Sequence, residues 1–333
     1  LYPNHYIILV SDSALCRKSS ALNIGIELLR EALDGQRDAI TVGLPVILSA
    51  KMTPEALCRA ISRKGLKDLE GLDIDIPERV SRPVILHSSE LGVFMSKSAQ
   101  MNGLVDLLMD FYDCPNVWEY VTKTQGTDIV YNVYACLLAA TTPGWISDNV
   151  TSSVFNQGLV GRTIFVYSNT PAHKEPFPYL TDQEKVYQQW LIDALQRYSS
   201  MSGPLTMDTY FAEWYQEREE PVGTSQLNSG FFGREHDHVL KLATLLAIGR
   251  AHHPIITAID IEDAIESMDT LKYGLENIFR EVNADREIYE VKIVEGVIRE
   301  KIEINRTNLL KRVYRNINNG KFDECLGSLI GAG

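Results

Sequence analysis

Short apolar segments alternate with amphipathic ones in the first half of the chain, and this pattern limits the possible folds more than any other feature. The segments with strand character are 6–10, 46–50, 84–87, 133–140 and 163–168. The stretches with helical spacing between them are 20–33, 54–64 and 100–112. Nearly continuous apolar strands separated by helices are typical of a mostly parallel sheet covered on both faces. We therefore expect an α/β fold that binds its ligand at the carboxyl ends of the strands.

The second half of the chain is expected to be helical. Helical patterns follow one another at 183–198, 207–217, 236–252 and 259–282. A polar, proline-rich stretch at 169–183 marks the boundary before them. A last segment, 285–333, has the order helix, link, helix, turn, helix, which favours a helix-turn-helix or an incomplete winged helix. The predicted domains are a core at 1–175, a helical domain at 176–284 and the last unit at 285–333.

Composition excludes several classes of protein. The chain lacks an apolar run of about 20 residues, so we expect no transmembrane helix and no membrane partner. Its five cysteines are scattered, which favours a reducing cytoplasm and argues against a structural zinc site. The first residue is Leu1 and no signal-peptide pattern follows, so we expect a piece of a longer cytoplasmic protein.

Charge gives only local support for nucleic-acid binding. The net charge of −12 argues against a globally basic protein. The segment from Arg299 to Lys321, however, contains seven Lys and Arg residues and only two Glu, which gives it a local charge of +5. A solvated helix face is the commoner explanation of such a run, and a DNA contact is the alternative.

The loop after the first strand has the outline of a phosphate-binding loop. The full pattern is G-x-x-x-x-G-K-[ST], and here Asp12 and Arg17 stand in place of the two glycines before Lys18 and Ser19. The amides at a helix N-terminus attract phosphate, Lys18 would reach the β- and γ-phosphates, and Ser19 would ligate Mg²⁺. Arg17 could pair with phosphate itself. An ordinary strand-turn-helix with an exposed Lys-Ser pair is the alternative. The candidate nucleotide-binding residues are Ser13, Ala14, Leu15, Cys16, Arg17, Lys18, Ser19 and Ser20.

A second strand end carries a carboxylate. The strand at 84–87 is followed by Ser88, Ser89 and Glu90. In P-loop ATPases a glutamate at this place polarises the attacking water, so Glu90 is the candidate general base. Ser89 stands where a magnesium-holding aspartate is usual and would touch the metal through water. A serine pair that caps a helix, with an acid in the first turn, explains the same residues.

Three further segments complete a recognisable order. Thr141 and Thr142 end the fourth strand in "VYACLLAATTPGWI", Arg162 directly precedes the fifth in "GLVGRTIFVYSNTP", and Arg234 begins the helical unit "REHDHVLKLATLLAIGRAHH". Together with the two loops, this order resembles the AAA+ replicative helicases, particularly the MCM-like ATPases and the primase–helicases of phages and mobile elements. The resemblance covers 6–333. It implies a P-loop NTPase (AAA+/RecA-like) core, a helical lid and a C-terminal winged helix.

The resemblance also implies residue roles. Thr141 or Thr142 would be the sensor that positions the attacking water, and Arg162 the finger that reaches the γ-phosphate of a neighbouring subunit. Arg234 would be the second sensor. Arg162 could instead cap a strand or pair with a surface carboxylate, and Arg234, which precedes Glu235, could form an ion pair on the helix surface.

The DNA contacts implied by the resemblance lie in two places. Lys123, in "NVWEYVTKTQGT", matches a lysine that tracks single-stranded DNA from a hairpin in the central pore. Lys311, Arg312 and Arg315 would add duplex contacts from the basic tail.

These roles imply an ATP-driven DNA helicase or translocase that replicates a phage or mobile element. ATP and Mg²⁺ would lie between the subunits of a homo-oligomeric ring, a hexamer by analogy, with single-stranded or duplex DNA as partner. Two alternatives remain open. One is a DNA-binding initiator or adaptor whose P-loop is degenerate and inactive, and the other is a nucleotide-switch ATPase without a DNA partner.

Overall fold

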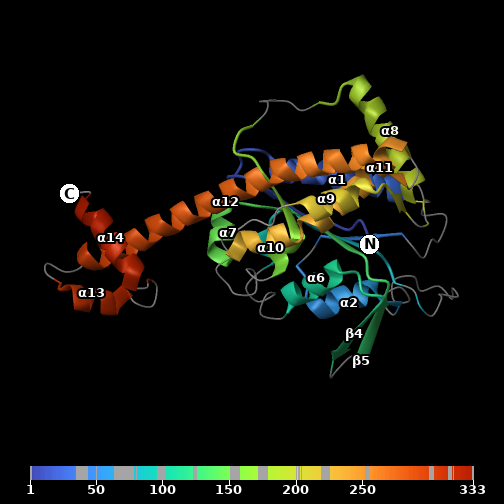
Figure 1. The fold of residues 1–333 in the computed structure, drawn as a ribbon. Coiled ribbons are helices and arrows are strands. Elements are labelled where there is room, and N and C mark those ends of the chain that lie inside the picture. The colour runs from blue at the N-terminus through green and yellow to red at the C-terminus, as the bar shows by residue number, and fades with distance from the viewer. Residues whose placement is uncertain are drawn as a thin grey trace.

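The fold has three parts: a central parallel sheet, a helical layer and a C-terminal three-helix unit (Figure 1). This arrangement comes from a computed structural model. The residues that the structure describes are 2–34, 44–49, 51–63, 79, 81–95, 103–122, 126–150, 158–171, 179–199, 201, 203, 205–218, 226–251, 255–299, 304–313, 317 and 319–331.

The sheet confirms the expected α/β class. Its five strands are all parallel, in the order β2-β3-β6-β1-β7. Their bounds are β1 Tyr6–Val10, β2 Val46–Leu48, β3 Val84–Ser88, β6 Ala135–Thr141 and β7 Thr163–Tyr167. The register places Val10 beside both Thr141 and Tyr167, so these strands end at one edge. That edge is where a parallel sheet of this kind binds its ligand.

Helices cover both faces of the sheet. Figure 1 shows α1 (Lys18–Asp34) and α8 (Asp182–Ser199) on one side, and α2 (Pro54–Ile61) and α6 (Leu104–Tyr112) on the other. Local sequence explains one boundary: α2 begins where the Thr53 hydroxyl accepts the Ala56 N–H and Pro54 takes the first turn. The short helices α4 (Leu91–Phe94) and α7 (Pro143–Val150) follow β3 and β6.

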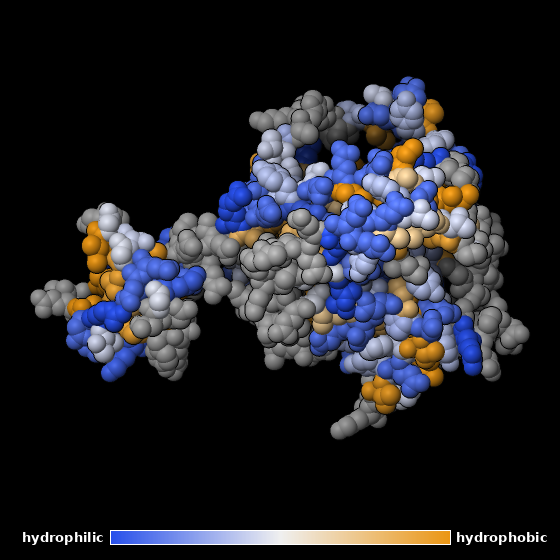
Figure 2. Space-filling model, viewed as in Figure 1, coloured by the Kyte–Doolittle hydropathy of each residue, from blue (hydrophilic) through white to orange (hydrophobic). Residues whose placement is uncertain are grey.

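An antiparallel hairpin stands out from the body before β6. It consists of β4 (Val117–Thr122) and β5 (Gly126–Tyr131) and projects at the bottom of Figure 1. Figure 2 shows hydrophobic side chains on this projection, where Val117 is 51% and Val121 71% exposed. The hairpin expected around Lys123 is therefore present. Lys123 itself lies outside the described residues.

The second half is largely helical, as expected, with one difference. It contains α9 (Tyr210–Glu217), α10 (Gln226–Gly233) and α11 (Glu235–Ala251). The strand-free expectation was wrong in detail, because β8 (Thr206–Met207) and β9 (Ile255–Ile256) form a parallel pair. Two-residue strands are too short to produce a periodic apolar pattern.

A single helix links the body to the C-terminal unit. α12 runs from Ala258 to Arg299, and the boundary expected at 284/285 falls inside it. The sequence between Phe279 and Val291 contains no glycine or proline, so nothing there stops a helix. At its far end, α12 joins α13 (Arg306–Val313) and α14 (Asn319–Gly331) around an apolar cluster that includes Val294 and Phe322. Figure 1 shows this unit standing clear of the sheet.

None of the helices in the described ranges combines the length and the apolar character that crossing a membrane requires.

Candidate functional site

The loop between β1 and α1 has the backbone shape that glycines would favour. Ala14 (φ 61°) and Arg17 (φ 47°) are both in the left-handed region. Arg17 occupies the place of the second glycine in the P-loop pattern. The backbone there is thus glycine-like, although the side chain is an arginine, and that conformation costs a non-glycine residue about 1 kcal/mol. Asp12, at the first glycine place, is not among the residues with positive φ.

Lys18 is the first residue of α1, and its amine is folded back over this loop. Nζ donates to the carbonyl oxygens of Ser11 (2.6 Å) and Asp12 (2.9 Å). Partial burial lowers the pKa of Lys18, while the neighbouring Cys16 and Asp12 act in the opposite direction. The amine is thus held at the start of α1, and both a lysine and a helix N-terminus attract anions.

The loop meets the end of β3. The Ser19 hydroxyl donates to the Ser89 carbonyl oxygen at 3.3 Å, so the two residues proposed as magnesium ligands are neighbours. Glu90 follows as the exposed N-cap of α4, and the Ser88 hydroxyl donates to its carbonyl oxygen at 2.7 Å. Lys18, Ser19, Ser89 and Glu90 thus gather at the carboxyl edge of the sheet, as the sequence predicts.

The two sensor candidates differ in what they do. The Thr142 hydroxyl accepts the Trp145 N–H at 3.3 Å and caps α7. Thr141 is the last residue of β6, between β3 and β1, and is nearly buried. Its carbonyl oxygen accepts the Ser11 N–H at 3.4 Å. Thr141 is therefore the better placed of the two.

Residues that the sequence did not single out support the loop from behind. The Asp12 N–H donates to Asn169 Oδ1 at 3.1 Å, and Asn169 Nδ2 donates to Glu281 Oε1 at 3.1 Å. The Tyr167 hydroxyl donates to the same oxygen of Glu281. Burial is the main cause that raises the pKa of Tyr167 to about 12, and the hydrogen bond to Glu281 is the next largest. The loop is thereby joined to the middle of α12.

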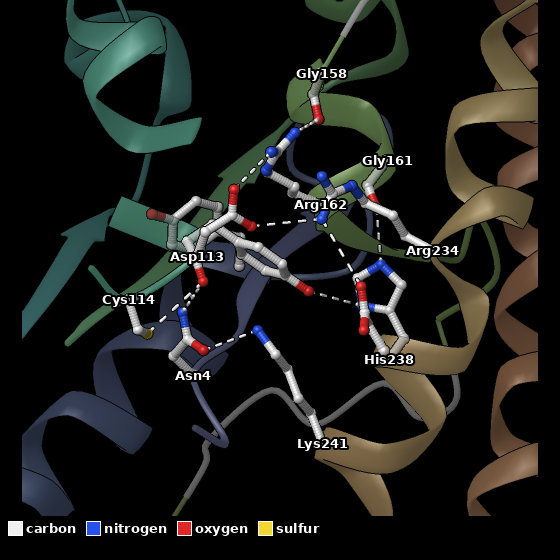
Figure 3. Close-up of polar contacts among 12 residues, drawn as sticks. Asn4, Asp113, Cys114, Gly158, Gly161, Arg162, Arg234, His238 and Lys241 are labelled. Atoms are coloured by element: carbon white, nitrogen blue, oxygen red, sulfur yellow. Dashed lines mark hydrogen bonds and ion pairs between the residues drawn. The ribbon is translucent and has the colours of Figure 1, made fainter. Parts of the chain in front are cut away.

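A second cluster forms at the opposite, amino edge of the sheet, and Figure 3 shows it closely. Arg162 ends a 3₁₀ turn (Val160–Arg162) before β7, and its Nη2 lies 2.9 Å from Asp113 Oδ2. Arg234 Nη1 lies 3.4 Å from the other carboxylate oxygen of Asp113. Both arginines therefore share one carboxylate at the C-terminal end of α6.

A buried polar network lies beneath this cluster. Lys241 Nζ donates to Asn4 Oδ1 at 2.8 Å and lies 3.5 Å from the centroid of the Tyr112 ring. Burial lowers the pKa of Lys241 to about 8. His238 Nε2 lies 3.0 Å from the Gly161 carbonyl oxygen. A cavity of about 230 Å³ opens beside Asn4 and Lys241. The network fixes α11 to the sheet. Its residues are far apart in the sequence, so no local pattern predicts their contacts.

The two clusters are far apart within one chain. β7 begins directly after Arg162 and ends beside Val10, just before the phosphate-type loop. Its five residues span about 16 Å. The structure therefore places Lys18 and Glu90 at one edge of the sheet and Arg162 and Arg234 at the other.

Two of the three DNA-binding candidates of the tail lie on α13 (Arg306–Val313). Lys311 and Arg312 are exposed on α13 and line a groove of about 1440 Å³. Arg315 lies outside the described residues. Across the groove, Asp323 of α14 pairs with Arg306 of α13.

No family model and no curated protein matches this chain. Within the described ranges, no group of three or more His, Cys, Asp or Glu side chains could hold a metal ion.

Proposed function

We propose that this chain is an ATPase of the AAA+ type whose active site forms between subunits of a ring. The observation that carries the proposal is the position of Lys18: it begins α1 at the carboxyl edge of the sheet, next to Ser19 and its contact with Ser89. The strand order supports it as well, because β6, which ends at the sensor candidate Thr141, lies between β1 and β3, which precede the loop and Glu90.

The residues at the carboxyl edge fit a magnesium–nucleoside triphosphate, which would supply the phosphoryl group. The amine of Lys18 and the first-turn amides would bind phosphate oxygens, and the hydroxyl of Ser19 would ligate the cation. Glu90 would accept a proton from the attacking water, and Thr141 would orient that water. When the nucleotide binds, the Lys18 amine would leave the two loop carbonyl oxygens and donate to phosphate oxygens instead.

The arginines complete this site only in an assembly. Arg162 and Arg234 lie at the opposite edge, so they would serve a nucleotide bound by the adjacent subunit. An arginine supplied from a neighbour contributes about 10³–10⁵ in rate where it has been measured. A homo-oligomeric ring is the arrangement that supports this geometry.

We propose that the ring uses ATP hydrolysis to move along DNA. The β4–β5 hairpin projects from the body as pore hairpins do, and Lys311 and Arg312 offer phosphate contacts on α13. Phosphate contacts suit movement along any sequence, because they carry no base information. Replication of a phage or mobile element is the setting that the resemblance implies.

Mixed rings test the shared site. Arg162→Ala should retain nucleotide binding and lose hydrolysis, and Glu90→Ala should likewise lose it. Mixing the two variants should partly restore phosphate release, because some interfaces combine an intact Glu90 with an intact Arg162. A mixture as inactive as its components, at concentrations where light scattering shows rings, would contradict the proposal.

One observation favours a second candidate, a DNA-binding initiator or adaptor on an inactive scaffold. Asp12 places a carboxylate in the loop, where it would repel phosphate, and its N–H is already bonded to Asn169. This candidate predicts tight duplex binding without nucleotide. The nucleotide-switch alternative predicts hydrolysis that single-stranded DNA does not change.

A further inference from the structure

The two arginines at the amino edge are placed by a residue with no assigned role. Asp113 follows α6, and its Oδ2 and Oδ1 oxygens lie 2.9 Å and 3.4 Å from Arg162 and Arg234. The arginines come from segments 49 and 121 residues away in the sequence. We propose that Asp113 is a positioning residue: it holds Arg162 and Arg234 side by side, facing the nucleotide of the neighbouring subunit. This inference rests on the proposed function.

Electrostatics explains why a carboxylate is needed there. Two guanidinium groups repel each other at short range unless an opposite charge lies between them. Asp113 gives each arginine one oxygen, and Asp237 is a further carboxylate near Arg234, at 3.7 Å. Without the charge of Asp113, the two arginines would separate, and the geometry required for a phosphoryl group would be lost.

The other contacts limit how far the arginines can move. Arg162 Nη1 donates to the Gly158 carbonyl oxygen at 3.4 Å, and its guanidinium lies 5.9 Å from the centroid of the Tyr112 ring. The side chain of Arg162 is only 14% exposed, against 32% for Arg234. Figure 3 shows both guanidinium groups directed toward Asp113. The pair is thus fixed at the surface of one subunit before a neighbour arrives.

A purely structural role for Asp113 is the competing explanation, and exposure argues against it. Its side chain is 54% exposed, and ion pairs with so exposed a partner add little to stability. The carboxylate should therefore matter for turnover more than for folding.

The test uses the assembled full chain with three substitutions at this position. Asp113→Asn keeps the shape and removes the charge, so kcat for ATP should fall about 10- to 100-fold while KM changes by less than about twofold. Asp113→Glu restores the charge and should recover part of kcat. Asp113→Ala should be partly rescued by mixing with Lys18→Ala, since each variant supplies the half that the other lacks.

Asp106→Asn is the matched control, because it removes an exposed carboxylate from the same helix, α6. It should leave kcat unchanged, and the melting temperatures of Asp113→Asn and the wild type should agree within about 3 °C. If Asp113→Asn kept the wild-type kcat, this inference would be overturned and the proposed function would stand. A larger loss of stability without rescue in mixed rings would also overturn it. Absence of any Lys18-dependent hydrolysis in the wild type would overturn the proposed function and this inference together.

Discussion

The Nζ atom of Lys18 lies 2.6 Å from the carbonyl oxygen of Ser11, so the side-chain amine is hydrogen-bonded to the backbone of the loop that precedes α1. Lys18→Ala should therefore abolish ATP binding, because the charge that would replace these carbonyl contacts with phosphate contacts is gone. The fold should survive, since Lys18 lies at the surface end of α1. Binding of a fluorescent nucleotide analogue, with phosphate release measured alongside, checks this. Lys185→Ala, which removes an exposed lysine paired with Asp182 on α8, is the control. Equal affinities for all three proteins would remove the phosphate-loop assignment.

The left-handed conformation of Arg17 gives a second prediction. Arg17→Gly should be at least as stable as the wild type, because glycine adopts φ 47° without steric cost. Arg17→Val should lose about 1–2 kcal/mol of unfolding free energy, since a β-branched residue is disfavoured there. Urea denaturation of both variants measures the difference, and Leu15→Val is the control in the same loop. If Arg17→Val proved as stable as Arg17→Gly, the loop would have another shape.

Buried histidines should make the fold sensitive to acid. Burial lowers the pKa of His238 to about 3, with Lys241 and Arg234 among the nearby cations that contribute, and lowers that of His5 to about 4. An unfolded histidine titrates near 6.5, so below that pH the unfolded chain takes up protons that the folded chain refuses. Unfolding free energy should therefore fall as the pH drops from about 6.5 toward 4, by up to about 1.4 kcal/mol per pH unit for each histidine.

Denaturation curves between about pH 7 and pH 4.5 test this linkage. His238→Gln keeps a donor for the Gly161 carbonyl oxygen and does not titrate, so its stability should depend less steeply on pH than that of the wild type. The carboxylates titrate equally in both proteins and cancel in the comparison. Parallel curves would show that His238 takes up its proton in the folded state.

DNA binding by the C-terminal unit should depend on α13. The double substitution Lys311→Ala, Arg312→Ala should weaken duplex binding and reduce the slope of log K against log salt by about 1.8, if each residue neutralises one phosphate. Fluorescence anisotropy between about 50 and 200 mM salt measures that slope. Lys185→Ala, on the body of the molecule, should leave it unchanged. An unaltered slope in the double variant would assign the basic run to a solvated face.

The sheet could be predicted from the sequence because buried parallel strands are continuously apolar, and Tyr6–Val10 has the predicted bounds. The position of Lys18 and Glu90 at the carboxyl edge could also be predicted, since Lys18 begins the helix after β1 and Glu90 lies in the loop after β3. Asp113 could not, because its partners are distant in sequence and a single aspartate after a helix carries no pattern. The contact of Asn169 with Glu281 was hidden for the same reason.

The uninterrupted course of α12 has a mechanical consequence. Its 42 residues give a rod about 63 Å long. About 27 Å of this length lies between Glu281, which contacts Asn169 behind the loop, and Arg299, where the helix ends in the C-terminal unit. A tilt of about 10° at Glu281 would carry the far end through about 5 Å, nearly one helical turn. A displacement that is small beside the sheet would therefore be several times larger at α13.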